Sequence, residues 1–168
     1  MWRIRIAGGE DRDDILALAD RLAEGIAAWR DADRWRSVAR SWVEESIGRA
    51  ATGDGALFVA RGEEQLPGGA GRLAGFVSVG SKKHFTGDVD AYVGELVVAP
   101  WAEGHGAGRE LMAAAETWAA EHGYLRLTLE TGASNTRARA FYARLGYLDE
   151  DVTLTKLLPG QADPSPGR

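Results

Sequence analysis

The order of apolar and polar positions along the chain predicts a mixed succession of strands and helices. Polar and apolar side chains alternate over residues 2–6, which is typical of a strand with one buried face. A helical stripe then follows Asp11 or Asp13, either of which can cap the N-terminus of a helix. The stripe consists of Ile15, Leu18, Ala19 and Leu22. Residues 23–33 are predicted to form a connection or a short helical turn.

A second helix is predicted from Arg34 to about Arg49, because the glycines of residues 53–55 end the helical pattern there. Its apolar positions approximate one helical face. They are Trp35, Val38, Trp42 and Ile47. Since Trp35 and Trp42 lie seven residues apart, which is two helical turns, we expect both rings to pack in the core.

The rest of the chain predicts further strands and two more helices. The strands are expected at Ala56–Arg61, Leu73–Val79, Tyr92–Ala99, Leu125–Glu130 and Val152–Leu158, and the helices at Gly108–Glu121 and Asn135–Leu145. The polar segment 62–69 is predicted to be a hairpin loop. Prolines gather in residues 159–168, which we predict to be a disordered tail. The pattern therefore indicates a single α/β (α+β) domain over residues 1–158.

Composition and charge narrow the class of protein. A chain of 168 residues that is 45% hydrophobic and 27% charged can bury a sizeable core. It contains no cysteine, which excludes disulfides, thiolate metal sites and an acyl-cysteine intermediate. The histidines lack metal-ligand spacing, so no metal is expected. A net charge of −5 argues against a nucleic-acid partner and suits a cationic amine. Without a signal pattern or a membrane-spanning stretch, we expect a cytoplasmic protein with no membrane partner.

Three glycines at alternate positions stand between a strand pattern and a helix pattern. Gly104, Gly106 and Gly108 follow Pro100 and precede an alanine-rich run. Glycines at such a turn leave backbone N–H groups uncovered at the positive end of the helix dipole. The segment therefore predicts an anion site, most naturally for a phosphate. The alternative interpretation is a tight turn without a ligand.

A second cluster of polar and aromatic residues follows one helix and one strand later. It consists of Glu130, Asn135, Ala138, Phe141, Tyr142 and the run Leu145-Gly146-Tyr147. Together the two clusters resemble the acetyl-coenzyme A site of the GCN5-related N-acetyltransferase (GNAT) family. The resemblance covers nearly the whole chain and is sharpest from Glu95 to Tyr147. It implies one GNAT-like domain, with a mixed central sheet of six to seven strands and about four flanking helices.

The resemblance also assigns residues to the coenzyme. Main-chain amides of the glycine loop are expected to hold its pyrophosphate, and this loop comprises Gly104, His105, Gly106, Ala107, Gly108 and Arg109. The backbone of Leu96, Val97 and Val98 is expected to pair with the pantetheine arm and to polarise the thioester carbonyl. Asn135 is expected to contact the coenzyme.

One position departs from the family pattern. Glu103 stands where the family usually has Arg or Gln. Its carboxylate would repel a pyrophosphate unless it points away or pairs with Arg109 or another cation.

The resemblance provides candidates for proton transfer as well. An amine with a pKa of about 10 is mostly protonated at neutral pH and needs a proton acceptor. Glu95 and Glu130 both match positions that carry the base in some family members. We prefer Glu95, because an inward-facing glutamate in an apolar strand would have a raised pKa. Tyr142 matches the tyrosine that protonates the departing thiolate, and its neighbour Phe141 is assigned to the core.

These assignments predict an N-acetyltransferase that acts on a primary amine of a small molecule or peptide. The acetyl group of acetyl-coenzyme A would be transferred by direct attack in a ternary complex. The alternative, motivated by Glu103, is a catalytically silent acyl-coenzyme A-binding sensor or interaction module. In the family the first helical region lines the acceptor pocket, which makes Trp29, near the acidic pair Asp31 and Asp33, a candidate there. The sequence leaves open the identity of the acceptor and whether the protein is a homodimer.

Overall fold

A computed structural model describes residues 2–63 and 70–158. Part of the predicted hairpin loop, residues 64–69, and the whole predicted tail lie outside the described residues. The strands are β1 (Trp2–Ile6), β2 (Ala56–Gly62), β3 (Leu73–Lys83), β4 (Val89–Val98) and β5 (Leu127–Leu129). The α-helices are α1 (Arg12–Leu18), α2 (Ala32–Thr52), α3 (Ala107–Glu121) and α4 (Thr136–Arg144). Short 3-10 helices lie at η1 (Gly9–Asp11), η2 (Ala19–Ala23) and η3 (Pro100–Ala102).

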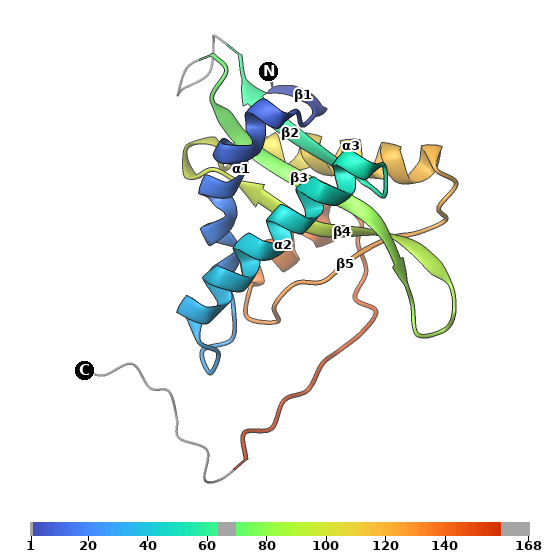
Figure 1. The fold of residues 1–168 in the computed structure, drawn as a ribbon. Coiled ribbons are helices and arrows are strands. Elements are labelled where there is room, and N and C mark those ends of the chain that lie inside the picture. The colour runs from blue at the N-terminus through green and yellow to red at the C-terminus, as the bar shows by residue number, and fades with distance from the viewer. Residues whose placement is uncertain (1, 64–69, 159–168) are drawn as a thin grey trace, which may run out of the picture.

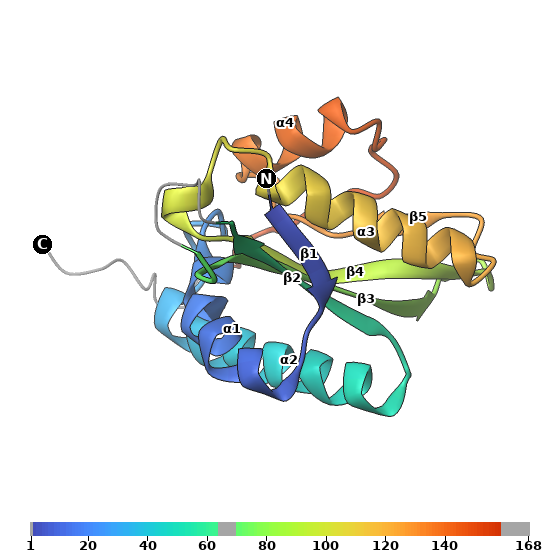
Figure 2. The ribbon, with the colours of Figure 1, turned by 90° about the horizontal axis from the view of Figure 1, so that it is seen from above.

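The described strands form one mixed sheet in the order β1-β2-β3-β4-β5. The first four strands pair antiparallel, and β5 pairs with β4 in parallel. Helices cover both faces, with α1 and α2 on one side and α3 and α4 on the other (Figure 2). Side chains alternate between the faces along each strand, so Phe76 packs under α1 and α2 whereas Val77 packs under α3. The central strand β3 is thereby buried on both faces over most of its length.

The buried face of α2 differs from the predicted stripe. Ala39, Val43 and Ser46 are its buried residues, and Trp42 is 42% exposed. The rings of Trp35 and Trp42 meet edge to face with their centroids 5.0 Å apart. Small side chains let the helix lie close to the sheet, and the wide indoles occupy its flank. The prediction that Trp42 packs in the core is therefore wrong.

The sheet is smaller than predicted, with five strands in the described part of the chain in place of six to seven. The predicted strand Val152–Leu158 does not form. Residues 148–158 run away from the sheet (Figure 1), with Val152 79% and Leu154 89% exposed. Alternating side chains make a strand only where a neighbour supplies backbone partners, and the edge strand β5 is only three residues long.

The Asp11 side chain lies in a buried ion cluster and accepts no capping hydrogen bond from the amides of α1. Its carboxylate is 0% exposed and accepts hydrogen bonds from Arg5 (2.6 and 2.9 Å), from Arg61 (2.6 and 2.9 Å) and from the Gly8 amide (2.8 Å). Burial alone would raise the pKa of Asp11, but these hydrogen bonds outweigh burial and lower the pKa. The carboxylate thus joins β1, η1 and β2.

We expect Asp11→Asn to lower the free energy of unfolding by about 2–4 kcal/mol near neutral pH, because two guanidinium groups lose their shared counter-ion. The folded pKa of Asp11 lies below the unfolded value. Its contribution is therefore present above the unfolded pKa and is lost as the pH falls through the folded pKa. Urea titrations at about pH 7 and about pH 3 should show a smaller deficit at the lower pH. Asp13→Asn, at an exposed carboxylate, is the control, and an Asp11 variant as stable as this control would contradict the prediction.

Candidate functional site

The site lies where β4 and β5 separate. The two strands pair only from Ala91 to Val93 on β4, opposite Leu127 to Leu129 on β5. Residues 94–98 of β4 continue without a strand on that side in the described chain. An unpaired strand edge offers backbone N–H and C=O groups to an extended ligand, which can bind as an additional strand.

A β-bulge on β4 marks the start of this free edge. Val77 pairs with Leu96 and Val79 pairs with Val93, so two β4 residues, Gly94 and Glu95, oppose Ser78 alone. A Cβ atom at position 94 would lie 2.8 Å from Ser78 Oγ, which only glycine avoids without a shift. The bulge turns Glu95 toward α2.

Glu95 is held in a buried network of hydroxyl groups and is only 5% exposed. Its Oε2 atom accepts hydrogen bonds from Ser46 Oγ at 2.9 Å and from Ser78 Oγ. Ser46 Oγ itself accepts from Arg49 Nη2 at 2.8 Å. Burial raises the pKa of Glu95, and the two serine hydroxyls and the Arg49 charge offset only part of this rise. A carboxylate with a raised pKa is suited to accept a proton near neutral pH.

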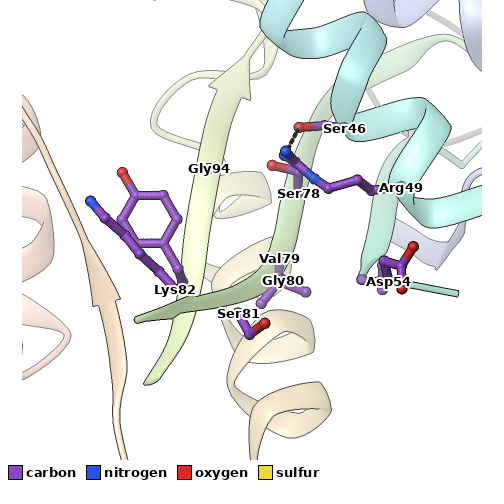
Figure 3. Close-up of a pocket in the computed structure, with 12 residues that line it drawn as sticks. Ser46, Arg49, Asp54, Ser78, Val79, Gly80, Ser81, Lys82 and Gly94 are labelled. Atoms are coloured by element: carbon purple, nitrogen blue, oxygen red, sulfur yellow. Dashed lines mark hydrogen bonds between the residues drawn. The ribbon is translucent and has the colours of Figure 1, made fainter. Parts of the chain in front are cut away.

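A pocket of about 250 Å³ opens on the α2 face of the sheet. Its lining includes Ser46 and Ser78, the two hydrogen-bond partners of Glu95, and the adjacent Gly94 (Figure 3). Residues that line it include Ser46, Arg49, Ser78, Lys82, Tyr92 and Gly94. The second carboxylate oxygen of Glu95, Oε1, accepts no hydrogen bond from the described residues and is not fully enclosed. This oxygen is therefore free to take a proton.

The glycine loop begins α3 as predicted. Gly106 is the N-cap residue and has a left-handed backbone with φ of 88°, a conformation that favours glycine. It has no side chain to cap the helix, so the first-turn amides of α3 are left for a ligand. Gly108 lies against β4 and α4, since a Cβ atom there would approach Val98 at 3.3 Å and Phe141 at 3.4 Å. This cradle fits a phosphate-bearing group, as the spacing of the glycines predicts.

Tyr142 lies on α4, on the face of the sheet opposite Glu95. Its ring packs against the core under α3, 5.3 Å from the ring of Phe141, and both rings are only partly buried. Phe141 packs against the core as expected, but it is only partly buried, and Tyr142 packs there too. Within residues 2–63 and 70–158 the Tyr142 hydroxyl has no hydrogen-bond partner, and burial raises the pKa of Tyr142 to about 12. The phenol stays protonated and can donate.

Residues 18–147 match the family model described as the Acetyltransferase (GNAT) family. The chain belongs to the GNAT acetyltransferase family. This match spans both clusters that the sequence singled out, and members of the family use acetyl-coenzyme A.

Solved structures of other acetyltransferases share the fold. A Pyrococcus furiosus protein whose name assigns it as an acetyl transferase is 23% identical (TM-score 0.72; 94% of this chain, 100% of the other). A GCN5-related N-acetyltransferase from Ralstonia eutropha is 22% identical (TM-score 0.67; 95% and 100%). The enzyme AAC(6')-Iy, bound to the bisubstrate analogue CoA-S-monomethyl-acetylneamine, is 17% identical (TM-score 0.68; 94% and 99%). No curated protein matches the chain in sequence.

Two classes of feature are absent from the described part of this GNAT acetyltransferase. No helix there has the length and apolar character needed to cross a membrane. Over the same residues, no three His, Asp or Glu side chains gather in a way that could hold a metal ion.

Glu130 differs from Glu95 in its surroundings. Its side chain is 73% exposed and forms an ion pair with Lys82, whose ammonium lies 4.5 Å from the centre of the Tyr92 ring. Tyr92 lies near both carboxylates. Burial raises the pKa of Tyr92, and the charges of Glu130 and Glu95 add to this rise. Both candidate bases therefore reach the α2 face, but only Glu95 is buried.

Glu103 is neutralised by two arginines. Its Oε1 atom accepts from Arg21 Nη2 at 2.6 Å and its Oε2 atom from Arg137 Nη2 at 2.7 Å. The sequence left open Arg109 or another cation as the partner, and the structure places two other arginines there. The Glu103 carboxylate is therefore paired, and it holds two guanidinium groups beside the glycine loop.

Asn135 caps α4, because its side chain accepts a hydrogen bond from the Ala138 amide at 3.1 Å. Its side-chain nitrogen donates to the carbonyl of Glu24 at 3.4 Å. The side chain thus joins α4 to the segment after η2. A contact between Asn135 and the coenzyme stays a prediction.

Asp31 and Asp33, the acidic pair near Trp29, are engaged at the start of α2. Asp31 is the N-cap of α2 and accepts from the amides of Asp33 and Arg34 at 2.9 and 3.0 Å. Asp33 forms an exposed ion pair with Arg36. The polar pocket that adjoins the candidate base instead involves the other end of α2.

Three residues that surround Glu95 were not predicted from the sequence: Ser46, Ser78 and Arg49. A weak signal exists for Ser78, because this residue interrupts an apolar run between Val77 and Val79 in a strand buried on both faces. Buried polar side chains in such strands need partners, and this one hydrogen-bonds the carboxylate.

Proposed function

We propose that this GNAT acetyltransferase transfers the acetyl group of acetyl-coenzyme A to a primary amine by direct attack in a ternary complex. The observation that carries the proposal is Glu95, a buried carboxylate with a raised pKa between a free strand edge and an open pocket. Acetyl-coenzyme A supplies the acetyl group as an activated thioester.

Two parts of the chain would bind the coenzyme. The first-turn amides of α3, from Ala107 to Arg109, lie at the positive end of the helix dipole and would hold the pyrophosphate. Backbone groups of residues 96–98, on the unpaired edge of β4, would pair with the pantetheine arm. Together they would position the thioester at the separation of β4 and β5.

Glu95 and Tyr142 would handle the protons from opposite faces of the sheet. Glu95 Oε1 accepts a proton from the ammonium group, which frees the nitrogen lone pair for attack. The N–C bond forms as the C–S bond breaks, and Tyr142 donates its phenolic proton to the departing sulfur. The nitrogen of the new amide still carries one excess proton, which passes through water to the Tyr142 phenolate, and Glu95 releases its own proton to water. The catalytic groups thus return to their starting state.

The glycine loop gives a direct test of the coenzyme site. Gly108→Leu should weaken binding of coenzyme A at least about tenfold, because the side chain enters the space between the loop, Val98 and Phe141. Isothermal titration calorimetry measures the change. Gly48→Leu, on the open surface of α2, is the matched control and should bind like wild type. Equal affinity of both variants would show that the coenzyme lies elsewhere.

The proposed activity is tested by thiol release from acetyl-coenzyme A in the presence of a panel of primary amines. Amine-dependent release supports the proposal. Coenzyme binding without release from any amine of the panel would instead indicate the silent acyl-coenzyme A-binding module.

A further inference from the structure

The pocket beside Glu95 carries cationic side chains on two walls. Arg49 projects from α2 and Lys82 from β3, with Ser78 and Gly94 between them in Figure 3. Lys82 is paired with Glu130. Arg49 forms no ion pair with a carboxylate among residues 2–63 and 70–158, although its charge lowers the pKa of nearby Glu95. The only hydrogen bond that its guanidinium group donates to these residues is the one to Ser46.

The carboxylate that lines the pocket does not neutralise Arg49. Asp54 accepts a hydrogen bond from Thr52 Oγ1 at 2.8 Å and forms no ion pair within the described chain. A guanidinium group has five N–H donors, and Arg49 uses one donor nitrogen on Ser46. The free donors form a fork that matches the two oxygens of a planar oxyanion.

Arg49 also lies close to the candidate base. A single hydroxyl, that of Ser46, bridges them, at 2.8 Å from Arg49 Nη2 and 2.9 Å from Glu95 Oε2. A molecule of a few heavy atoms can therefore reach both groups, with its amine at Glu95 and its other end at Arg49. The net charge of −5 repels anions from the protein as a whole, so binding of an oxyanion here requires these local cations.

On the basis of the proposed function, we propose that the acceptor is a small amine that also carries an oxyanion, as amino acids do, and that Arg49 binds this oxyanion. Lys82, on the facing wall, is already paired with Glu130, so the oxyanion contact is assigned to Arg49. The pocket then selects its substrate by two opposite charges, a cationic amine at Glu95 and an anionic group at Arg49. This differs from the simple cationic amine that the net charge suggests.

Matched substrate pairs test this inference. Thiol release from acetyl-coenzyme A is measured with amino acids and with the corresponding amino acid amides, which lack the negative charge. Phosphoethanolamine and ethanolamine form a second pair, which distinguishes a phosphate from a carboxylate as the oxyanion. We expect wild-type kcat/KM to favour the charged member of at least one pair by about tenfold or more, as for a charge-assisted bidentate contact.

Arg49→Gln should abolish this preference, mainly through a higher KM for the charged member. The readout is the ratio of kcat/KM for the charged substrate to kcat/KM for the neutral substrate of a pair. Any effect of the Arg49 substitution on Glu95 changes both values alike and cancels in this ratio. Lys83→Gln, next to Lys82 but outside the pocket lining, should keep the wild-type ratio. Arg49→Lys should restore part of it, since it keeps the charge but not the fork.

The possible outcomes separate the two proposals. Equal turnover of charged and neutral members by the wild type overturns the oxyanion inference and leaves acetyl transfer standing. Absence of thiol release from every amine overturns the proposed function. In that case, calorimetry with N-acetylated amino acids and N-acetylphosphoethanolamine decides the inference. Weaker binding to Arg49→Gln than to wild type supports it, and equal or undetectable binding to both proteins overturns it.

Discussion

Tyr142→Phe is expected to lower kcat about 10²- to 10⁴-fold, the range for loss of a well-placed general acid. Burial raises the pKa of Tyr142 to about 12, and its hydroxyl makes no hydrogen bond to the described residues, so it is available to a leaving group. Phenylalanine keeps the ring and its packing against the core. Steady-state thiol release should therefore fall while the calorimetric affinity for coenzyme A stays close to wild type.

Tyr147→Phe is the matched control for this change. The Tyr147 ring lies 5.8 Å from that of Tyr142, and burial also raises the pKa of Tyr147. Its hydroxyl, however, donates to Glu116 at 3.2 Å, on the outer side of α3. This variant should keep wild-type turnover. A loss of turnover in Tyr147→Phe without a loss in Tyr142→Phe would transfer the acid role to Tyr147.

Glu95→Gln is expected to lower kcat/KM about 10²- to 10⁴-fold near neutral pH, because no group then accepts the amine proton. The pKa of Glu95 is raised by burial, so the wild-type rate should fall as the pH drops through this value and the carboxylate becomes protonated. The glutamine variant lacks that dependence. Its remaining activity should rise with pH as free amine accumulates, so its deficit should shrink at high pH. A pH–rate profile measures both effects.

Glu130→Gln is the control for the base. This exposed side chain is paired with Lys82, and its replacement should leave the pH–rate profile unchanged. Rescue at high pH in Glu130→Gln but not in Glu95→Gln would assign the base to Glu130. Wild-type turnover in both variants would show that neither carboxylate accepts the proton.

Local pattern in the sequence was enough to predict most of the elements that build the site. Alternation predicted β1, because side chains on a strand point to opposite faces, and apolar runs bounded by turn residues predicted β2, β3 and β4. The alternate glycines predicted the start of α3, where a left-handed residue at Gly106 leaves the amides of the first turn free. Each of these features depends on residues close together in the sequence.

The burial of Glu95 was expected from its apolar strand, but its hydrogen-bond partners depend on long-range contacts and were not predicted. Its carboxylate meets Ser46, which is 49 residues away, and Ser78, which is 17 residues away. No local pattern encodes these contacts, because they arise only when α2 packs across the sheet and the bulge in β4 turns Glu95 toward the helix.

The sequence by itself determined the order of most strands and helices and the glycine turn that begins α3, because periodicity and glycine conformation act over a few residues. Only the tertiary structure decided the partners of charged groups. Glu103 finds Arg21 from η2 and Arg137 from α4, at separations of 82 and 34 residues. The tertiary structure also explains why the predicted strand Val152–Leu158 does not form. A strand needs backbone partners on a neighbouring edge, and β5, with only three residues, offers few.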